Sequence, residues 1–184
     1  MKPYLLEKSL DDAKVIRRGE YNYFIHPLTD SIPPIQPQLM KEVCERIMDV
    51  ADLDADYILT MEAMGIHIGA VLSQMTGLPL NIIRKRKYGV DGEITLDQTT
   101  GYSKGNMYLN NVKEGDKITI VDAVISTGGT LTAVINALKQ RKAVIKDIIC
   151  VIERDDGVKD ILEKTGCEVK TLTKIKVGKK IERI

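Results

Sequence analysis

Residues 117–141, KITIVDAVISTGGTLTAVINALKQR, decide the fold of this chain. Residues 118–121 form a short run of apolar and β-branched side chains, which predicts a buried strand. The second half predicts an amphipathic helix, because apolar residues recur there at the spacing of one helical face: Leu131, Val134, Ile135 and Leu138. We therefore expect a strand, a short loop and a helix in succession, as in α/β proteins.

The loop between the expected strand and helix is rich in glycine and hydroxyl side chains. It consists of Ser126, Thr127, Gly128, Gly129 and Thr130. At the N-terminus of a helix, unpaired backbone N–H groups and the positive end of the helix dipole attract anions. Glycine lets the backbone approach a phosphate closely, and hydroxyl groups donate further hydrogen bonds. The loop therefore predicts a phosphate-binding site.

The residues around this loop indicate which kind of phosphate it binds. The lysine of a nucleoside-triphosphate loop is missing after the glycines, and the Gly-x-Gly-x-x-Gly pattern of dinucleotide sites is missing as well. Instead, Asp122 follows the apolar run, and the apolar residues Val124 and Ile125 precede the loop. This order of residues resembles the phosphoribosyl-pyrophosphate signature of the type I phosphoribosyltransferases.

The composition indicates one compact domain. The chain has 184 residues, of which 43% are hydrophobic, and a net charge of +1. We expect a single domain, residues 1–184, and exclude nucleic acid and anionic membranes as partners. The three cysteines are far apart in sequence, which favours a reducing compartment over a disulfide framework or a metal site. Because no apolar run approaches the length of a membrane span, a cytoplasmic location is expected.

Strands and helices alternate along the chain, which predicts an α/β fold with a mostly parallel sheet flanked by helices. Residues 1–36 are expected to be irregular, and residues 37–184 to form the α/β core, whose first helix begins at Pro37. Further strands are predicted at residues 57–61, 78–83, 107–109, 148–152 and 169–175. In such sheets, ligands bind at the carboxyl ends of the strands.

Residues 84–105 differ in kind from the rest of the core. They are polar, contain four glycines and show no apolar periodicity. We therefore expect a flexible loop about twenty residues long. Loops of this length inside a compact domain often serve as lids over a site.

Several stretches extend the resemblance to most of the chain, from about Tyr23 to Ile175. Residues 57–65, YILTMEAMG, resemble the strand and pyrophosphate loop of the adenine phosphoribosyltransferases. Residues 23–27, YFIHP, residues 100–105, TGYSKG, and residues 150–154, CVIER, resemble the archaeal hypoxanthine/guanine enzymes. The chain is therefore identified as a member of the purine phosphoribosyltransferases, most similar to their archaeal hypoxanthine/guanine group.

The resemblance implies a fold and an activity. The fold would be that of the type I phosphoribosyltransferases, with a small N-terminal hood that binds the base and a long flexible loop. The activity would be that of a glycosyltransferase of purine salvage, which transfers 5-phosphoribosyl from phosphoribosyl pyrophosphate to hypoxanthine and guanine. The products would be IMP or GMP and pyrophosphate. The resemblance further implies Mg²⁺ as cofactor, small-molecule substrates and a homodimer.

The resemblance also implies roles for individual residues. Asp122 is the expected catalytic residue, which would bind the ribose hydroxyls and is the one side chain considered as a direct ligand of Mg²⁺. The loop of residues 126–130 would bind the 5′-phosphate of phosphoribosyl pyrophosphate. Pyrophosphate would be bound by Glu62, Ala63, Met64, Gly65, Arg84, Lys85 and Lys104. The base would lie against Phe24, His26 and Val124.

Two departures from the family pattern leave the assignment open in part. The family signature carries two adjacent acids, whereas Ala123 stands at the second position here. The group that protonates the purine is unassigned, with Glu93 and Asp97 as candidates. No side chain identifies the base, so adenine is an alternative substrate. Two further functions stay open: a regulator that senses phosphoribosyl pyrophosphate without turnover, and an unrelated phosphate-binding domain.

Overall fold

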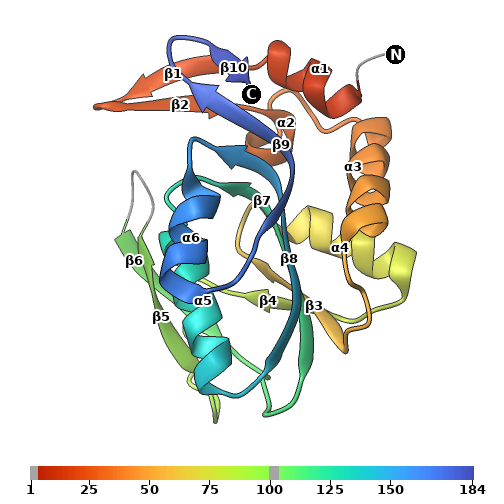
Figure 1. The fold of residues 1–184 in the computed structure, drawn as a ribbon, viewed down its shortest axis with the longest axis vertical. Coiled ribbons are helices and arrows are strands. Elements are labelled where there is room, and N and C mark those ends of the chain that lie inside the picture. Colours follow the sequence, from red (N-terminus) through yellow and green to blue (C-terminus); the bar gives the residue numbers. More distant parts are fainter. Residues whose placement is uncertain (1–3, 100–103) are drawn as a thin grey trace.

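The computed structural model describes residues 4–99 and 104–184 and has a six-stranded sheet at its centre (Figure 1). The strand order is β10-β9-β8-β7-β3-β4. The strands are β3 (Tyr57–Met61), β4 (Leu80–Ile83), β7 (Lys117–Ile125), β8 (Val144–Arg154), β9 (Lys170–Val177) and β10 (Ile181–Arg183). Neighbouring strands pair in parallel except β10, which pairs antiparallel with β9. The predicted, mostly parallel α/β sheet is confirmed.

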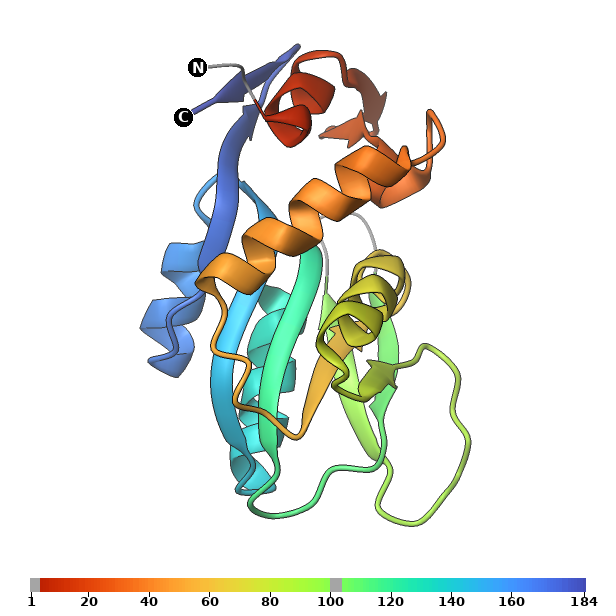
Figure 2. The same cartoon turned by 90° about the vertical axis from the view of Figure 1, so that its right-hand side faces the viewer.

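Helices cover both faces of this sheet, as predicted. Figure 1 shows α5 (Gly129–Gln140) and α6 (Gly157–Thr165) on one face, and Figure 2 shows α3 (Pro37–Val50) and α4 (Ile66–Thr76) across the other. The helix α4 ends at Gly77, whose φ of 76° lies in the left-handed region that favours glycine. Within the described residues, no helix is long and apolar enough to cross a lipid bilayer.

The central strand β7 is buried on both faces and separates two hydrophobic clusters. Ala123 packs into the cluster under α3 and α4, whereas Ile120 packs into the cluster under α5. The strand is longer than the predicted residues 118–121, because β8 pairs with it as far as Ile125. Asp122 therefore lies inside the strand and does not follow it.

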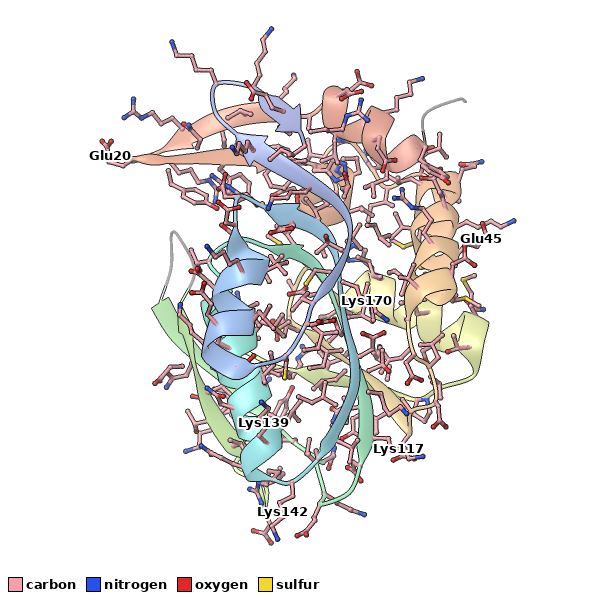
Figure 3. All side chains as sticks on the ribbon, in the orientation of Figure 1. Glu20, Glu45, Lys117, Lys139, Lys142 and Lys170 are labelled. Atoms are coloured by element: carbon pink, nitrogen blue, oxygen red, sulfur yellow. The ribbon has the colours of Figure 1, made fainter. Side chains whose placement is uncertain are left out.

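The first 36 residues are not irregular, contrary to the prediction. They contain α1 (Leu5–Asp11), β1 (Lys14–Arg18), β2 (Tyr21–Ile25) and α2 (Pro27–Asp30), which together we call the hood. The strands β1 and β2 form an antiparallel hairpin that turns at Gly19, where φ is 62°. The prediction missed this hairpin because β1 is mostly exposed and carries no apolar alternation. The hood lies over the carboxyl ends of β7 and β8 (Figure 1), with Glu20 at its outer tip (Figure 3).

The predicted loop of residues 84–105 is also partly wrong. It contains β5 (Ile94–Thr99) and the start of β6 (Lys104–Leu109), which pair as an antiparallel hairpin. Leu96, Met107 and Leu109 are buried in the cluster under α5. The alternation in each strand is only two apolar residues long, too short to stand out from the polar residues around it. Residues 100–103, which belong to the expected lid, lie outside the described residues.

His26 is buried inside the hood and joins three of its elements. Its Nδ1 accepts a hydrogen bond from the N–H of Leu28 at 3.2 Å, which caps α2. Its Nε2 lies 2.8 Å from the hydroxyl of Ser9, which in turn donates to the carbonyl of Leu6. Because Nδ1 accepts, Nε2 carries the hydrogen and the ring is neutral. Burial lowers the pKa of His26 to about 4, against the opposing influence of Asp30.

We expect this buried histidine to make the protein less stable as the pH falls from 6.5 to 4. In that interval the unfolded chain binds a proton at His26 that the folded chain does not bind. The free energy of unfolding should fall by roughly 3 kcal/mol over the whole interval from this group alone. Urea unfolding at several pH values, compared between the wild type and His26→Gln, measures the effect. The same pH dependence in both proteins would contradict it.

Candidate active site

A pocket lies where the carboxyl ends of β3, β7 and β8 meet the hood. Its floor comes from the ends of these strands and the loops that follow them, and its upper wall comes from β2 and α2. Because the three strands run in parallel, their carboxyl ends lie at one edge of the sheet, where α/β proteins bind ligands. Segments far apart in the sequence therefore contribute to one site.

The glycine-rich loop forms one end of this pocket. All five of its residues line the pocket: Ser126, Thr127, Gly128, Gly129 and Thr130. Gly128 is the N-cap of α5, and no side chain among the described residues caps this helix. The backbone N–H groups of the first turn are therefore available to an anion. Gly128 has a φ of 68°, and a Cβ there would lie 2.6 Å from the Ile161 side chain, so glycine is required.

Gly157, the first residue of α6, supports the loop from behind. A Cβ atom at this position would overlap the backbone carbonyl of Ser126. The close contact fixes the distance between α6 and the loop, so it also fixes where the loop points. This residue escaped prediction because nothing in the local sequence shows which segment α6 packs against.

Asp122 projects from β7 into the middle of the pocket and is partly exposed. Burial raises the pKa of its carboxyl group to about 7, although a hydrogen bond from the N–H of Ala123 at 2.8 Å favours the charged form. Gly65 lies beside it, because a Cβ at that position would overlap the hydroxyl of Thr60 and lie 3.0 Å from Asp122 Oδ1. Ala123, where the family has its second acid, points into the core. The carboxylate of Asp122 therefore faces the pocket without an acidic neighbour in the strand.

The loop after β3 and the residues after β4 form a third wall. Glu62, Ala63 and Met64 line the pocket, and the Glu62–Ala63 peptide bond is cis. The carboxylate of Glu62 accepts a hydrogen bond from the N–H of Lys85 at 3.0 Å and pairs with Arg84 Nε at 3.0 Å. The carboxylate of Glu62 thus joins the two segments.

Of the predicted pyrophosphate group, Glu62, Ala63, Met64 and Lys85 line the pocket, whereas Gly65 and Arg84 do not. Lys85 lines the pocket, but the guanidinium group of Arg84 lies against Glu62 and outside the pocket lining. A side chain that follows a strand can point to either face, and the sequence did not decide between the two. Lys104 begins β6, and its side chain lies outside the described residues.

The hood supplies an aromatic wall opposite the sheet. The predicted base contacts Phe24 and Val124 line the pocket, and the wall also contains Tyr21 and Tyr23, which were not predicted from the sequence. The prediction for His26 is wrong, because its ring is fully buried and serves the hood. Aromatic residues alternate with other residues at positions 21 and 23, which could have predicted this wall. The pattern indicates a common face only once the hairpin is known.

Arg154 is a further pocket residue that was not predicted from the sequence. It is the last residue of β8 and is buried, although its side chain carries a charge. Its guanidinium carbon lies 4.0 Å from the centre of the Tyr21 ring, and its Nε donates to Asp155 at 3.1 Å. The Tyr21 hydroxyl lies 3.4 Å from the hydroxyl of Ser126, so hood and glycine-rich loop meet here. In the sequence, Arg154 ends the CVIER stretch that resembles the archaeal enzymes, and the charged pair after an apolar run gave a second signal.

The two suggested proton donors do not line the pocket. Glu93 accepts hydrogen bonds from the N–H groups of Tyr88 and Gly89 at 2.9 and 3.0 Å, which holds it within its own turn. Asp97 is exposed on β5. Neither carboxylate therefore faces the pocket that the described residues form.

The fold and the pocket define an α/β protein with a glycine-rich, uncapped helix start at the carboxyl edge of its sheet. A family model described as "Phosphoribosyl transferase domain" matches residues 35–180. The chain belongs to the phosphoribosyl transferase family, as its resemblance to that family predicts.

Similar proteins agree with this assignment. A hypoxanthine/guanine phosphoribosyltransferase of Methanocaldococcus infernus is 57% identical, with 94% of each chain covered. A hypoxanthine/guanine phosphoribosyltransferase of Methanothermococcus okinawensis is 55% identical, again with 94% of each chain covered. In fold, the chain is similar to the crystal structure of adenine phosphoribosyltransferase from Thermoanaerobacter pseudethanolicus, with a TM-score of 0.75. The superposition covers 92% of this chain and 99% of the other chain. Because the two sequences are only 21% identical, the similarity concerns the fold alone.

Gly157→Ala tests the contact behind the glycine-rich loop. The added methyl group overlaps a backbone carbonyl, which cannot move aside as a flexible side chain would. We expect a loss of about 1–3 kcal/mol, or a Tm lower by about 3–10 °C. Gly178→Ala is the matched control, because the nearest atom to its added Cβ is 3.8 Å away. Equal melting temperatures of the two variants would contradict the contact.

Proposed function

We propose that this chain is a purine salvage enzyme that transfers 5-phosphoribosyl from phosphoribosyl pyrophosphate to hypoxanthine and guanine. The products are IMP or GMP and pyrophosphate. The observation that carries the proposal is that the glycine-rich loop and Asp122 open into one pocket beneath an aromatic wall. The names of the relatives that match 94% of the chain support the choice of bases.

The glycine-rich loop, residues 126–130, binds the 5′-phosphate. The first turn of α5 offers backbone N–H groups and the positive end of the helix dipole, and the three hydroxyl side chains donate further hydrogen bonds. A phosphate held at several points fixes the position of the ribose that carries it. The reacting carbon of the ribose is thereby held in place, which lowers the entropic part of the barrier.

Asp122 acts on the ribose. In the reaction, the bond from ribose C1 to pyrophosphate breaks, a bond from C1 to a purine ring nitrogen forms, and the purine releases its ring N–H proton to water. Positive charge develops on the sugar as pyrophosphate leaves, and a carboxylate in a partly buried site stabilises that charge more strongly than one in water. Asp122 also accepts hydrogen bonds from the ribose hydroxyls. The Ala123 N–H uses one acceptor site of the carboxylate, and the remaining lone pairs can accept from the substrate.

Pyrophosphate binds between the loop after β3 and Lys85. The ammonium group of Lys85 neutralises the leaving group, and Ala63 and Met64 line the space next to it. The carboxylate of Glu62 does not bind pyrophosphate directly, since like charges repel. Its hydrogen bond to the Lys85 N–H and its ion pair with Arg84 position this wall instead.

Magnesium ion is the proposed cofactor. Mg²⁺ prefers oxygen ligands and keeps several waters, and the carboxylate of Asp122 is an oxygen donor of the required kind inside the pocket. Among the described residues no group of three or more His, Cys, Asp or Glu side chains forms a metal site, so substrate oxygens would complete the coordination. When bound, the ion would neutralise phosphate charge and assist the departure of pyrophosphate.

We also propose a homodimer in the cytoplasm, as the family resemblance implies.

Turnover assays test the proposed reaction. Hypoxanthine, guanine, xanthine, adenine and orotate are offered separately with phosphoribosyl pyrophosphate and Mg²⁺, and the nucleotides are resolved by chromatography. We expect IMP and GMP as products. Asp122→Asn should lower kcat/KM by about 10²–10³-fold, because it removes the charge that stabilises the cationic sugar.

Asp54→Asn is the matched control for this variant. Asp54 is an exposed acid that pairs with Lys117 and Lys146 at the amino end of the sheet, away from the pocket. Its replacement should leave kcat/KM unchanged. AMP as the sole product would favour adenine as substrate. If the protein binds phosphoribosyl pyrophosphate but forms no product with any base, the result would contradict the enzyme and favour a regulator of the same fold.

A further inference from the structure

Thr60 is a fully buried polar residue that is not among the residues lining the pocket. It lies on β3, at the point where that strand separates from β7. The pairing of these two strands ends at Leu59 and Ile120, whereas β3 stays paired with β4 as far as Met61. Beyond Leu59, β3 therefore follows β4 and leaves the central strand.

A side-chain hydrogen bond joins the two strands one residue beyond the end of their pairing. The hydroxyl of Thr60 donates to the backbone carbonyl of Val121 at 2.8 Å. This carbonyl belongs to the peptide unit that directly precedes Asp122. The Thr60 hydroxyl thus ties β3 to β7 at the level of the carboxylate that faces the pocket.

The same hydroxyl contacts the loop after β3. Gly65 packs so closely on it that a Cβ atom at residue 65 would overlap the oxygen, and this Cβ would also lie 3.0 Å from Asp122 Oδ1. The methyl group of Thr60 faces α4, since a Cβ at Gly69 would lie 3.2 Å from it. The side chain of Thr60 therefore holds together the central strand, the loop of residues 62–65 and the helix that follows.

The distance between this loop and Asp122 bears directly on the reaction. In the proposed function, Asp122 on β7 stabilises the ribose, while Ala63 and Met64 lie beside the leaving pyrophosphate. The bond that breaks, from ribose C1 to pyrophosphate, thus joins two groups that are held by different strands. A change in the separation of the strands would misplace one group relative to the other, and small misplacements of reacting groups are costly in rate.

We propose that Thr60 is a positioning residue for phosphoribosyl transfer, whose hydroxyl group holds the loop of residues 62–65 at a fixed distance from Asp122. The proposal rests on the proposed function and adds to it a residue that touches neither substrate. The loop of residues 126–130 follows β7, and the aromatic wall belongs to the hood, so neither depends on this contact. Loss of the hydroxyl therefore slows the transfer but leaves nucleotide binding intact.

Thr60→Val tests the hydroxyl, because valine keeps the methyl group that faces α4 and nearly the same volume. We expect the single-turnover rate of IMP formation from hypoxanthine and phosphoribosyl pyrophosphate to fall by about 10- to 100-fold. The Kd for IMP, measured by calorimetry, should change by less than about threefold, since its contacts lie elsewhere. Thr60→Ser keeps the donor and should stay within about threefold of the wild-type rate.

Thr119→Val is the matched control. Thr119 is also fully buried, and its hydroxyl donates to the carbonyl of Asp52 at 2.6 Å, near the amino end of β7. This variant should lower the Tm as Thr60→Val does, because each removes one hydrogen bond to a backbone carbonyl, but it should leave the rate of transfer unchanged. Equal rate losses in Thr60→Val and Thr119→Val, an unchanged rate in Thr60→Val, or an equal loss in Thr60→Ser would overturn the proposal.

Hydrogen exchange tests the position of the loop without turnover. The N–H groups of Gly65 and Ile66 donate to backbone carbonyls at 3.3 Å, and these hydrogen bonds open when the loop moves. Thr60→Val should accelerate their exchange by about tenfold, because the loop loses the contact that holds it. Thr119→Val should not accelerate it. Unchanged exchange in Thr60→Val would refute the role of Thr60, whatever the wild type catalyses.

Failure of the wild type to form IMP would refute the proposed function, while hydrogen exchange would still decide whether Thr60 holds the loop. If Thr60→Val does not fold, Thr60→Ala is compared with Thr60→Ser, because these two variants differ only in the hydroxyl group. The slower transfer and the faster exchange are then expected in Thr60→Ala, and equal behaviour of the two variants would overturn the proposal.

Discussion

The parallel pairing of β7 with β3 and β8 is the constraint on which the rest of the structure depends. It places the ends of three strands at one edge of the sheet, so that Asp122, the glycine-rich loop and Arg154 reach the same pocket. Burial on both faces fixes the register of β7, because a shift by one residue would turn Asp122 into the core and Ala123 into the pocket. The position of the carboxylate is thus set by the packing of the core.

Close contacts at glycines then fix the loops around the pocket. Gly128 fits against Ile161, Gly157 against the Ser126 carbonyl, and Gly65 against Thr60 beside Asp122. None of these positions has room for a methyl group. The glycine-rich loop, the carboxylate of Asp122 and the third wall are therefore held at fixed distances before any ligand arrives. Preorganisation of this kind lowers the cost of binding and of stabilising charge.

The sequence predicted well what depends on local pattern. The strand, loop and helix of residues 117–141 lie as expected, because apolar periodicity and a glycine-rich helix start are local signals. The hood hairpin and the hairpin of β5 and β6 were missed, since their strands are short and β1 is mostly exposed. The placement of Arg84 on Glu62 and of Arg154 on Tyr21 depends on which segments meet in space. Nothing in the neighbouring residues decides such contacts.

A crystal structure of the protein with bound IMP would test the central claim, that one pocket holds phosphate, ribose and base in this order. We predict the phosphate about 3 Å from backbone N–H groups of residues 127–130, with the ribose hydroxyls at Asp122 and the base beside Phe24 and Val124. A phosphate bound beside Lys85 instead, with the glycine-rich loop uninvolved, would contradict the account.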